Sequence, residues 1–159
     1  MTIPEKMMGV FKTEPGYDKM DFLPLDVPKA VDDKVLIKVA FTGICGSDIH
    51  TFKGEYNNPT TPVVLGHEFS GQVVAVGDQV TKVKVGDRVT SETTFETSTD
   101  IYTHDKQYNL AMWRKGIGTQ QNGSMAKYVL AREESIHHLP DSLSYEGAAM
   151  TEPLACCVH

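Results

Sequence analysis

Residues Lys34–Phe41 read KVLIKVAF, and this stretch gives the clearest indication of the fold. Its odd-numbered residues, from Val35 to Phe41, are all apolar, whereas Lys34 and Lys38 fall on the opposite face. A period of two is typical of a β-strand that buries one face. We therefore expect a half-buried strand at Lys34–Phe41.

Further strand patterns follow along the chain. The segment Glu68–Val76, EFSGQVVAV, is rich in β-branched residues and ends at the turn pair Gly77-Asp78. A second Gly-Asp pair, Gly86-Asp87, precedes another expected strand, and Met125–Ala131 alternates again. The polar, threonine-rich segment Ser91–Thr103 is interpreted as a long surface loop. Short strands with regular turn signals favour a closed or partly closed β-barrel, so the predicted fold class is mainly β with short helices.

Composition and charge restrict the possible functions. The chain has 159 residues, of which 40% are hydrophobic and 23% charged, as in an ordinary globular domain. Fifteen basic and twenty-one acidic residues give a net charge of −6, and no basic cluster is present to neutralise nucleic-acid phosphates. No apolar run approaches the ~18 residues of a membrane span, and the N-terminus does not resemble a signal peptide. We expect no nucleic-acid or membrane partner.

The cysteines indicate a reducing compartment. The chain has three, Cys45, Cys156 and Cys157, and the last two are sequence neighbours that rarely pair with each other. A disulfide framework is not expected, and the predicted location is cytoplasmic. Cys156 and Cys157 are expected to be buried packing residues.

The C-terminal segment predicts two short helices. Ser144 is placed to cap the first, and Pro153 is expected to open the second after an extended Glu152. The residues after Pro153 are nearly all apolar, so this helix needs burial on every side, yet it has less than two turns. A docked or disordered tail and a fragment cut before a second domain both explain this pattern, and we favour the fragment.

Three segments carry residues that can bind a metal ion. Cys45 lies in GICGSDIH, His67 and Glu68 lie in GHE, and Glu152 lies in TEP. Thiolate, imidazole and carboxylate suit zinc, and three protein ligands leave a fourth position open for water or substrate. Cys45 and His67 are 22 residues apart, without a compact ligand motif. From spacing alone, a buried cysteine and a hydrogen-bonded core histidine are the more ordinary interpretation.

Longer segments resemble a known family. Gly43–Tyr56 (GICGSDIHTFKGEY), Val63–Val89 (VVLGHEFSGQVVAVGDQVTKVKVGDRV) and Glu146–His159 (EGAAMTEPLACCVH) are similar to zinc-dependent alcohol dehydrogenases of the medium-chain family, most of all to sorbitol or L-iditol 2-dehydrogenases. The resemblance implies a GroES-like, partly open β-barrel that supplies the catalytic zinc, followed in the family by a Rossmann domain that binds NAD(P).

The resemblance also implies a domain boundary. No G-x-G-x-x-G follows a strand in this chain, so none of its residues is expected to bind the cofactor. We expect a GroES-like zinc-binding catalytic domain at 1–152, with 153–159 the start of the connecting helix to a missing Rossmann domain. The fragment itself is expected to be inactive.

The ligand set implied by the resemblance has four members. Cys45 and His67 would be zinc ligands, and Glu68 would be a ligand or would exchange with zinc-bound water. Glu152 would be a ligand or an acid close to the metal. Alcohol-type relatives carry a second cysteine in this role, and the glutamate found here favours polyols over simple primary alcohols.

Three further residues receive roles from the resemblance. Asp48 would orient the ligand histidine, as a carboxylate next to a metal-bound imidazole commonly does. Ser47 and His50 match the hydroxyl and imidazole of the family's proton relay. Two alternatives stay open: Asp48 as the cap of the turn after Gly46, and His50 as an ordinary surface histidine.

Several other candidates are expected to have structural or surface positions. His137 and His138 are interpreted as a surface pair at a strand end, and His104 as solvated. Met112 and Trp113 are expected to cover the barrel.

The implied function is oxidation of a polyol or secondary alcohol to a ketone. Zinc would act as a Lewis acid, Ser47 and His50 would carry the released proton, and the hydride would pass to NAD(P). The full-length protein is expected to form a homo-oligomer. A non-enzymatic, co-chaperonin-like barrel and a zinc hydrolase are the alternative functions.

A second, structural zinc is not expected. Many relatives hold one with four cysteines in the loop after GDRV, and the matching positions here are Thr97, Asp100, Thr103 and Ala111. These residues offer at most one charged oxygen ligand, which cannot close a tetrahedral site. We expect one zinc per chain, at the Cys45–His67 site.

Overall fold

The structure is a computed structural model that describes residues 2–56, 59–97, 99–105, 107 and 110–158. Its strands are β1 (Lys6–Lys12), β2 (Met20–Asp26), β3 (Lys34–Thr42), β4 (Val63–Val64), β5 (Phe69–Val76), β6 (Arg88–Ser91), β7 (Thr94–Thr97), β8 (Arg114–Gly116), β9 (Tyr128–Arg132) and β10 (Ile136–His138). Its helices are α1 (Gly46–Lys53), α2 (Ile101–His104), the 3₁₀ helix η2 (Glu133–Ser135), α3 (Tyr145–Ala149) and α4 (Thr151–Val158).

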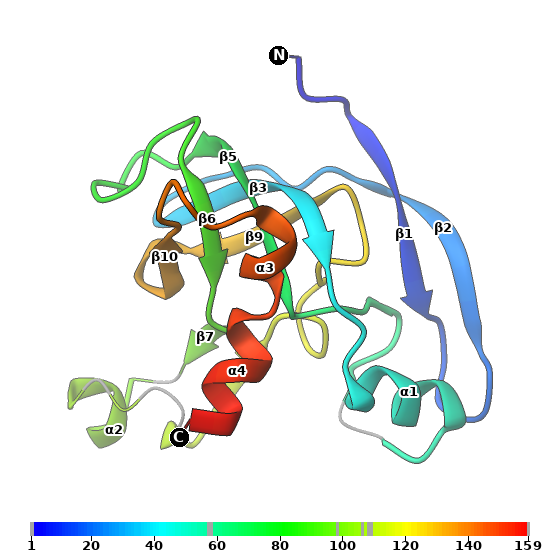
Figure 1. Cartoon of the computed structure of the whole chain (residues 1–159). Coiled ribbons are helices and arrows are strands. Elements are labelled where there is room, and N and C mark those ends of the chain that lie inside the picture. The colour runs from blue at the N-terminus through cyan, green and yellow to red at the C-terminus, as the bar shows by residue number, and fades with distance from the viewer. Residues whose placement is uncertain (1, 57–58, 98, 106, 108–109, 159) are drawn as a thin grey trace.

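The strands form three antiparallel sheets, ordered β2-β1-β4, β10-β6-β5-β3-β9 and β7-β8. The five-stranded sheet is the central element, and helix α3 packs on its strands β3 and β5 (Figure 1). The mainly β fold with short helices is confirmed, and the sheets stay open instead of closing into one ring. No helix in the described residues is long and apolar enough to cross a membrane.

Strand β3 lies in the middle of the core, between β5 and β9. Val35 and Ile37 are fully buried in the main core cluster, as the alternating pattern predicts. Leu36, on the opposite face, is buried as well, because Met7 and Tyr128 form a second small core with it. The prediction of a half-buried strand is therefore wrong for this part of β3, which is covered on both faces.

The far end of β3 departs from the simple alternation. The pairing of β3 with β5 has register irregularities between Leu36 and Ile37 and between Val39 and Phe41. The second irregularity inserts Ala40 between the paired residues Val39 and Phe41, so the simple alternation does not continue past it. Phe41 is consequently exposed, although the pattern placed it with the buried residues.

The Ser91–Thr103 segment is more ordered than its composition predicts. It contains strand β7, which pairs with β8, and it leads into helix α2. The interpretation as a surface loop fails because Phe95 packs into the main core and anchors the segment. Asp100 caps α2 by accepting hydrogen bonds from the N–H groups of Tyr102 and Thr103.

The two C-terminal helices form with one difference from the prediction. Ser144 caps α3, accepting a hydrogen bond from the Gly147 N–H at 3.1 Å. Helix α4 already begins at Thr151, so Glu152 is helical and not extended. Pro153 is tolerated there because N–H groups in the first turn of a helix have no partner within the helix.

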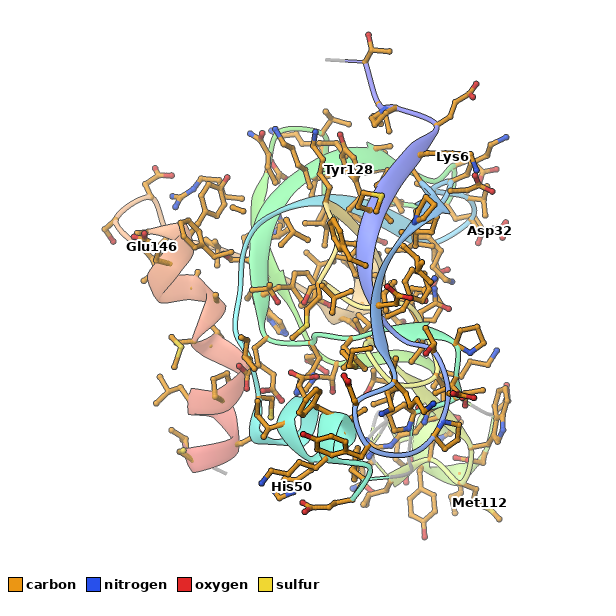
Figure 2. The ribbon with its side chains drawn as sticks, turned by 90° about the vertical axis from the view of Figure 1, so that its right-hand side faces the viewer. Lys6, Asp32, His50, Met112, Tyr128 and Glu146 are labelled. Carbon is orange, nitrogen blue, oxygen red and sulfur yellow. The ribbon has the colours of Figure 1, made fainter. Side chains whose placement is uncertain are left out.

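Most of helix α4 is exposed. None of its residues is buried, and Leu154 is 62% exposed. Cys156 and Cys157 are both exposed, so the prediction that they are packing residues is wrong. Figure 2 shows the helix along one edge of the molecule.

Candidate metal centre

Cys45 is fixed by the start of helix α1. It is the N-cap residue, and its backbone N–H donates to Asp48 Oδ2 at 2.9 Å. In return, the Asp48 N–H donates to the Cys45 carbonyl at 3.0 Å. The alternative interpretation of Asp48 as a cap is therefore confirmed, and this reciprocal bonding orients the Cys45 backbone.

Asp48 also connects the two segments that carry candidate ligands. Its carboxylate accepts a second backbone hydrogen bond from Gly66 and is attracted to the adjacent His67. Burial raises the pKa of Asp48 above its usual range and the nearby Glu68 raises it further, whereas the hydrogen bonds and His67 oppose this shift. One buried carboxylate thus touches the Cys45 loop and the His67 loop together.

His67 and Glu68 lie in the short connection between β4 and β5. Gly66, just before them, has a φ of +94°, which a residue with a side chain rarely adopts. A Cβ at this position would come within 2.8 Å of Ser124 Oγ. The Gly66 carbonyl accepts the Ser124 N–H at 2.9 Å, which anchors the turn to the neighbouring segment.

The side chains of Cys45, His67 and Glu68 converge. Each offers one ligand atom, and these sulfur, nitrogen and oxygen atoms all lie within 4.8 Å of one another. Ligand atoms around a tetrahedral zinc are about 3.3–3.8 Å apart, given zinc–ligand distances of 2.0–2.3 Å. This group fits zinc in both chemistry and spacing, and small side-chain movements would close it around an ion.

The carboxylate of Glu68 is held by close packing against Gly43. The Gly43 N–H donates to the Glu68 carbonyl at 2.6 Å. A Cβ on Gly43 would overlap Glu68 Oε2, so glycine is the residue that leaves room for this carboxylate. Glu68 itself is buried, which keeps it beside the other two candidate ligands.

A cavity of about 420 Å³ opens beside this group. His67, Ser47 and Glu152 all line it. Glu152 is nevertheless outside the convergent group, and its carboxylate accepts a hydrogen bond from the Cys156 thiol at 3.5 Å. The structure therefore brings three of the four expected ligands together and leaves Glu152 on the cavity wall.

His50 has a different environment from Ser47. Its Nδ1 lies 2.7 Å from Glu55 Oε2, and the imidazole is exposed. His50 is not among the residues that line the cavity, and in Figure 2 it projects outward from α1.

Sequence reasoning missed part of the cavity wall. Met112 and Trp113 are 86% and 55% exposed and line the cavity, so the expectation that they cover the barrel is wrong. Arg114 and Lys115 follow them on the same wall. The run WRK at 113–115 combines an aromatic ring with two cations and was the available signal.

The positions that match the family's structural zinc are used differently here. The Asp100 carboxylate accepts backbone hydrogen bonds from Tyr102, Thr103 and Met112. Thr103 Oγ1 donates to the Asp100 carbonyl, and Ala111 is buried. The side chain of Thr97 lies outside the described residues.

Three further histidines, His104, His137 and His138, are at the surface, as expected. His137 and His138 lie in β10, and their Nε2 atoms are 3.0 Å from carboxylate oxygens of Glu92 and Asp87. His104 is exposed next to Asp105.

The chain is similar to named polyol dehydrogenases. It is 78% identical over 154 residues to D-arabitol-phosphate dehydrogenase from Enterococcus avium and 50% identical over 154 residues to sorbitol dehydrogenase from Halalkalibacterium halodurans. These matches cover 96% of this chain but 44% and 45% of the relatives, so the chain spans less than half of their length.

A solved structure has the same fold. A protein from Sinorhizobium meliloti 1021, assigned as a zinc-binding dehydrogenase and bound to NADP, matches with a TM-score of 0.88 and 33% identity. The match covers 98% of this chain and 45% of the other.

A family comparison agrees with the fold. The model of the alcohol dehydrogenase GroES-like domain matches residues 31–141. This range includes the five-stranded sheet and both segments that carry Cys45, His67 and Glu68. The resemblance noted in the sequence is therefore confirmed, and the chain belongs to the family of alcohol dehydrogenase GroES-like domains.

Proposed function

We propose that the full-length protein containing this chain is a zinc-dependent, NAD(P)-dependent dehydrogenase that oxidises a polyol or a polyol phosphate to a ketone. The observation that carries the proposal is the convergence of Cys45, His67 and Glu68 beside a cavity of about 420 Å³. The activities for which the two relatives are named support this substrate class, and the NADP in the solved structure supports the cofactor.

Cys45, His67 and Glu68 would hold the zinc, and Glu152 would approach it from the cavity wall as a further ligand or a nearby acid. When bound, zinc supplies Lewis acidity to a substrate hydroxyl. The chain's own residues determine where that hydroxyl can lie, because His67 and Ser47 line the same cavity.

The proton would leave through the chain's own polar groups. Ser47 lines the cavity and would take the first hydrogen bond from the substrate hydroxyl. His50, three residues later on α1, is exposed and paired with Glu55, which suits the solvent end of a relay. Asp48 would fix the His67 loop relative to the Cys45 loop, since its carboxylate accepts hydrogen bonds from both.

The proposal includes one zinc per chain and no structural zinc. Asp100, the one charged residue among the four matching positions, already accepts three backbone hydrogen bonds. Thr103 and Ala111 offer no soft ligand.

The proposal also covers the organisation of the whole protein. Residues 1–152 would be the catalytic domain, and 153–159 the start of a helix leading to a Rossmann domain that binds NAD(P). The exposed apolar side chains of α4 support a neighbour at this position. The three free cysteines support a cytoplasmic location, and homo-oligomers are proposed from the family resemblance.

The test is NAD(P)-dependent polyol oxidation by the full-length, zinc-loaded protein and by its Cys45→Ser variant. We expect turnover by the wild type, with zinc and activity lost together in the variant. Hydrolysis of esters without nicotinamide dependence would identify a zinc hydrolase. A wild-type protein that folds fully and binds no zinc would favour a non-enzymatic barrel.

A further inference from the structure

Strand β8 contributes two cations to the wall of the cavity. Arg114 and Lys115 both line it, together with Ser47 and His67. The chain as a whole has a net charge of −6. The positive charge on this wall is therefore local and does not reflect a generally basic surface.

The cationic wall is attached to the core of the protein. Gly116, at the end of β8, pairs with Thr94, and the next residue, Ile117, is buried and donates its N–H to the Thr93 carbonyl at 2.8 Å. The backbone of the two cations is therefore held at the cavity.

The two side chains are placed to receive an anion. Lys115 Nζ lies 5.2 Å from the ring centroid of Trp113, which also lines the cavity, so the ammonium stays near this wall. Arg114 forms no ion pair with any carboxylate in the part of the chain that the structure describes, and its side chain is exposed. A guanidinium in this state can bind a phosphate through two parallel hydrogen bonds.

We propose that Arg114 and Lys115 bind the phosphate of a phosphorylated polyol while another carbon of the same molecule reaches the Cys45–His67 metal site. This inference rests on the proposed function and adds the residues that select the phosphorylated substrate. The cavity volume of about 420 Å³ lies within the ~300–1,000 Å³ of small-molecule sites, which leaves room for a short carbon chain with a phosphate at its end.

A second source of phosphate is the dinucleotide cofactor, which carries phosphates of its own. The two sources differ in which kinetic constant depends on the cations. Substrate phosphate predicts an effect on the KM of the polyol phosphate, and cofactor phosphate predicts an effect on the KM of NAD(P).

The experiment compares D-arabitol phosphate with D-arabitol as substrates of the full-length, zinc-loaded protein. The variants are Arg114→Gln and Lys115→Gln, with Lys29→Gln as a control because Lys29 is an exposed lysine outside the cavity. We expect each cavity variant to raise the KM for D-arabitol phosphate about tenfold or more, the loss typical of one charge-assisted hydrogen bond. Kinetics with D-arabitol, and the KM for NAD(P), stay unchanged. Arg114→Lys, which keeps the charge, restores part of the affinity.

Two kinetic results would overturn the inference. One is an equal rise in KM for D-arabitol and for D-arabitol phosphate, which would mean that the substitution disturbs the structure of the cavity. The other is a rise in the KM for NAD(P) without a change for the polyol phosphate, which would assign the cations to the cofactor.

Calorimetric titration of the same proteins with D-arabitol phosphate separates this inference from the proposed function. In one outcome neither substrate is oxidised, yet the wild type binds the phosphate ester more tightly than D-arabitol and Arg114→Gln abolishes this preference. The proposed function then fails, and the anion site stands. If the wild type binds both compounds equally, the anion site is refuted even when the dehydrogenase activity is present.

Discussion

The loops that carry Cys45 and His67 differ sharply from helix α4, which carries Glu152. The loops are tied to each other by the buried Asp48 carboxylate and lie against the core. Helix α4 has no buried residue, and the one hydrogen bond of the Glu152 side chain in the described residues is with Cys156 on the same helix.

This difference indicates how the site is organised. Three candidate ligands are positioned by contacts within this chain, before any metal binds. The fourth, Glu152, is on helix α4, which makes few contacts with the rest of the described chain. Its position relative to the metal is therefore less well fixed by this chain. We expect the first group to determine zinc affinity and Glu152 to adjust it.

The strongest test of this difference exchanges sulfur for oxygen in each region. Cys45→Ser removes the only thiolate of the convergent group, and we expect zinc affinity to fall by about a hundredfold or more, since the thiolate is the softest ligand there. Cys157→Ser makes the same chemical change on exposed α4 and should leave affinity unchanged.

Both variants are measured by competition with a chelating dye, together with elemental analysis. The wild type and Cys157→Ser should hold one equivalent of zinc after desalting, and Cys45→Ser should hold none. A second equivalent that survives in Cys45→Ser would reveal a structural zinc, and unchanged affinity in Cys45→Ser would remove Cys45 from the ligand set.

A second test adds one methyl group beside the ligand loops. In Gly43→Ala the new Cβ would overlap the Glu68 carboxylate, so we expect a loss of about 1–3 kcal/mol in the free energy of unfolding, as overpacking typically causes. Zinc affinity should fall as well, because Glu68 must move. The measurement is urea unfolding of the metal-free protein, followed by zinc titration.

Gly46→Ala is the matched control for this methyl group. A Cβ at Gly46 meets no atom within 4 Å, and alanine suits the first turn of α1. Its stability should equal or exceed that of the wild type. Equal losses in the two variants would show that the Gly43 effect arises from the backbone and not from contact with Glu68.

The third test compares the two carboxylates directly. Glu68→Gln should lower zinc affinity by about tenfold or more, and Glu152→Gln should lower it less, since Glu152 is outside the convergent group. Isothermal titration of both variants with zinc measures the difference. A larger loss in Glu152→Gln would reverse the comparison and make Glu152 the third ligand.

Much of the fold could be predicted because it depends on local patterns. The alternation in β3, the Gly-Asp turns and the Ser144 cap all act within a few residues, and each of these elements forms. Burial of Leu36 could not be predicted in the same way, since it depends on Met7 and Tyr128, which are distant in the sequence.

The site could be predicted only in part, for a similar reason. Cys45, His67 and Glu68 followed from the family resemblance and not from their spacing, because the fold alone brings these segments together. Arg114 and Lys115 were missed, since the run WRK by itself does not show which of its side chains face a cavity. The apolar sequence of α4 predicted burial, but the helix is mostly exposed. An apolar sequence favours burial and does not by itself show that another surface covers the helix.

The smallest expected effect concerns the reactivity of the three cysteines. The Glu152 carboxylate raises the pKa of the Cys156 thiol, through its charge first and its hydrogen bond second. A raised pKa leaves less thiolate near pH 8, so Cys156 should react more slowly with iodoacetamide than it does in Glu152→Gln. Removing the charge should increase the Cys156 rate a few-fold and leave Cys45 unaffected.

Added zinc should protect Cys45, which lies in the convergent group, and leave the two α4 cysteines reactive. Mass spectrometry of alkylated peptides with and without zinc gives all three rates. Protection of Cys156 by zinc would show that α4 closes over the metal and would end the distinction between the two regions.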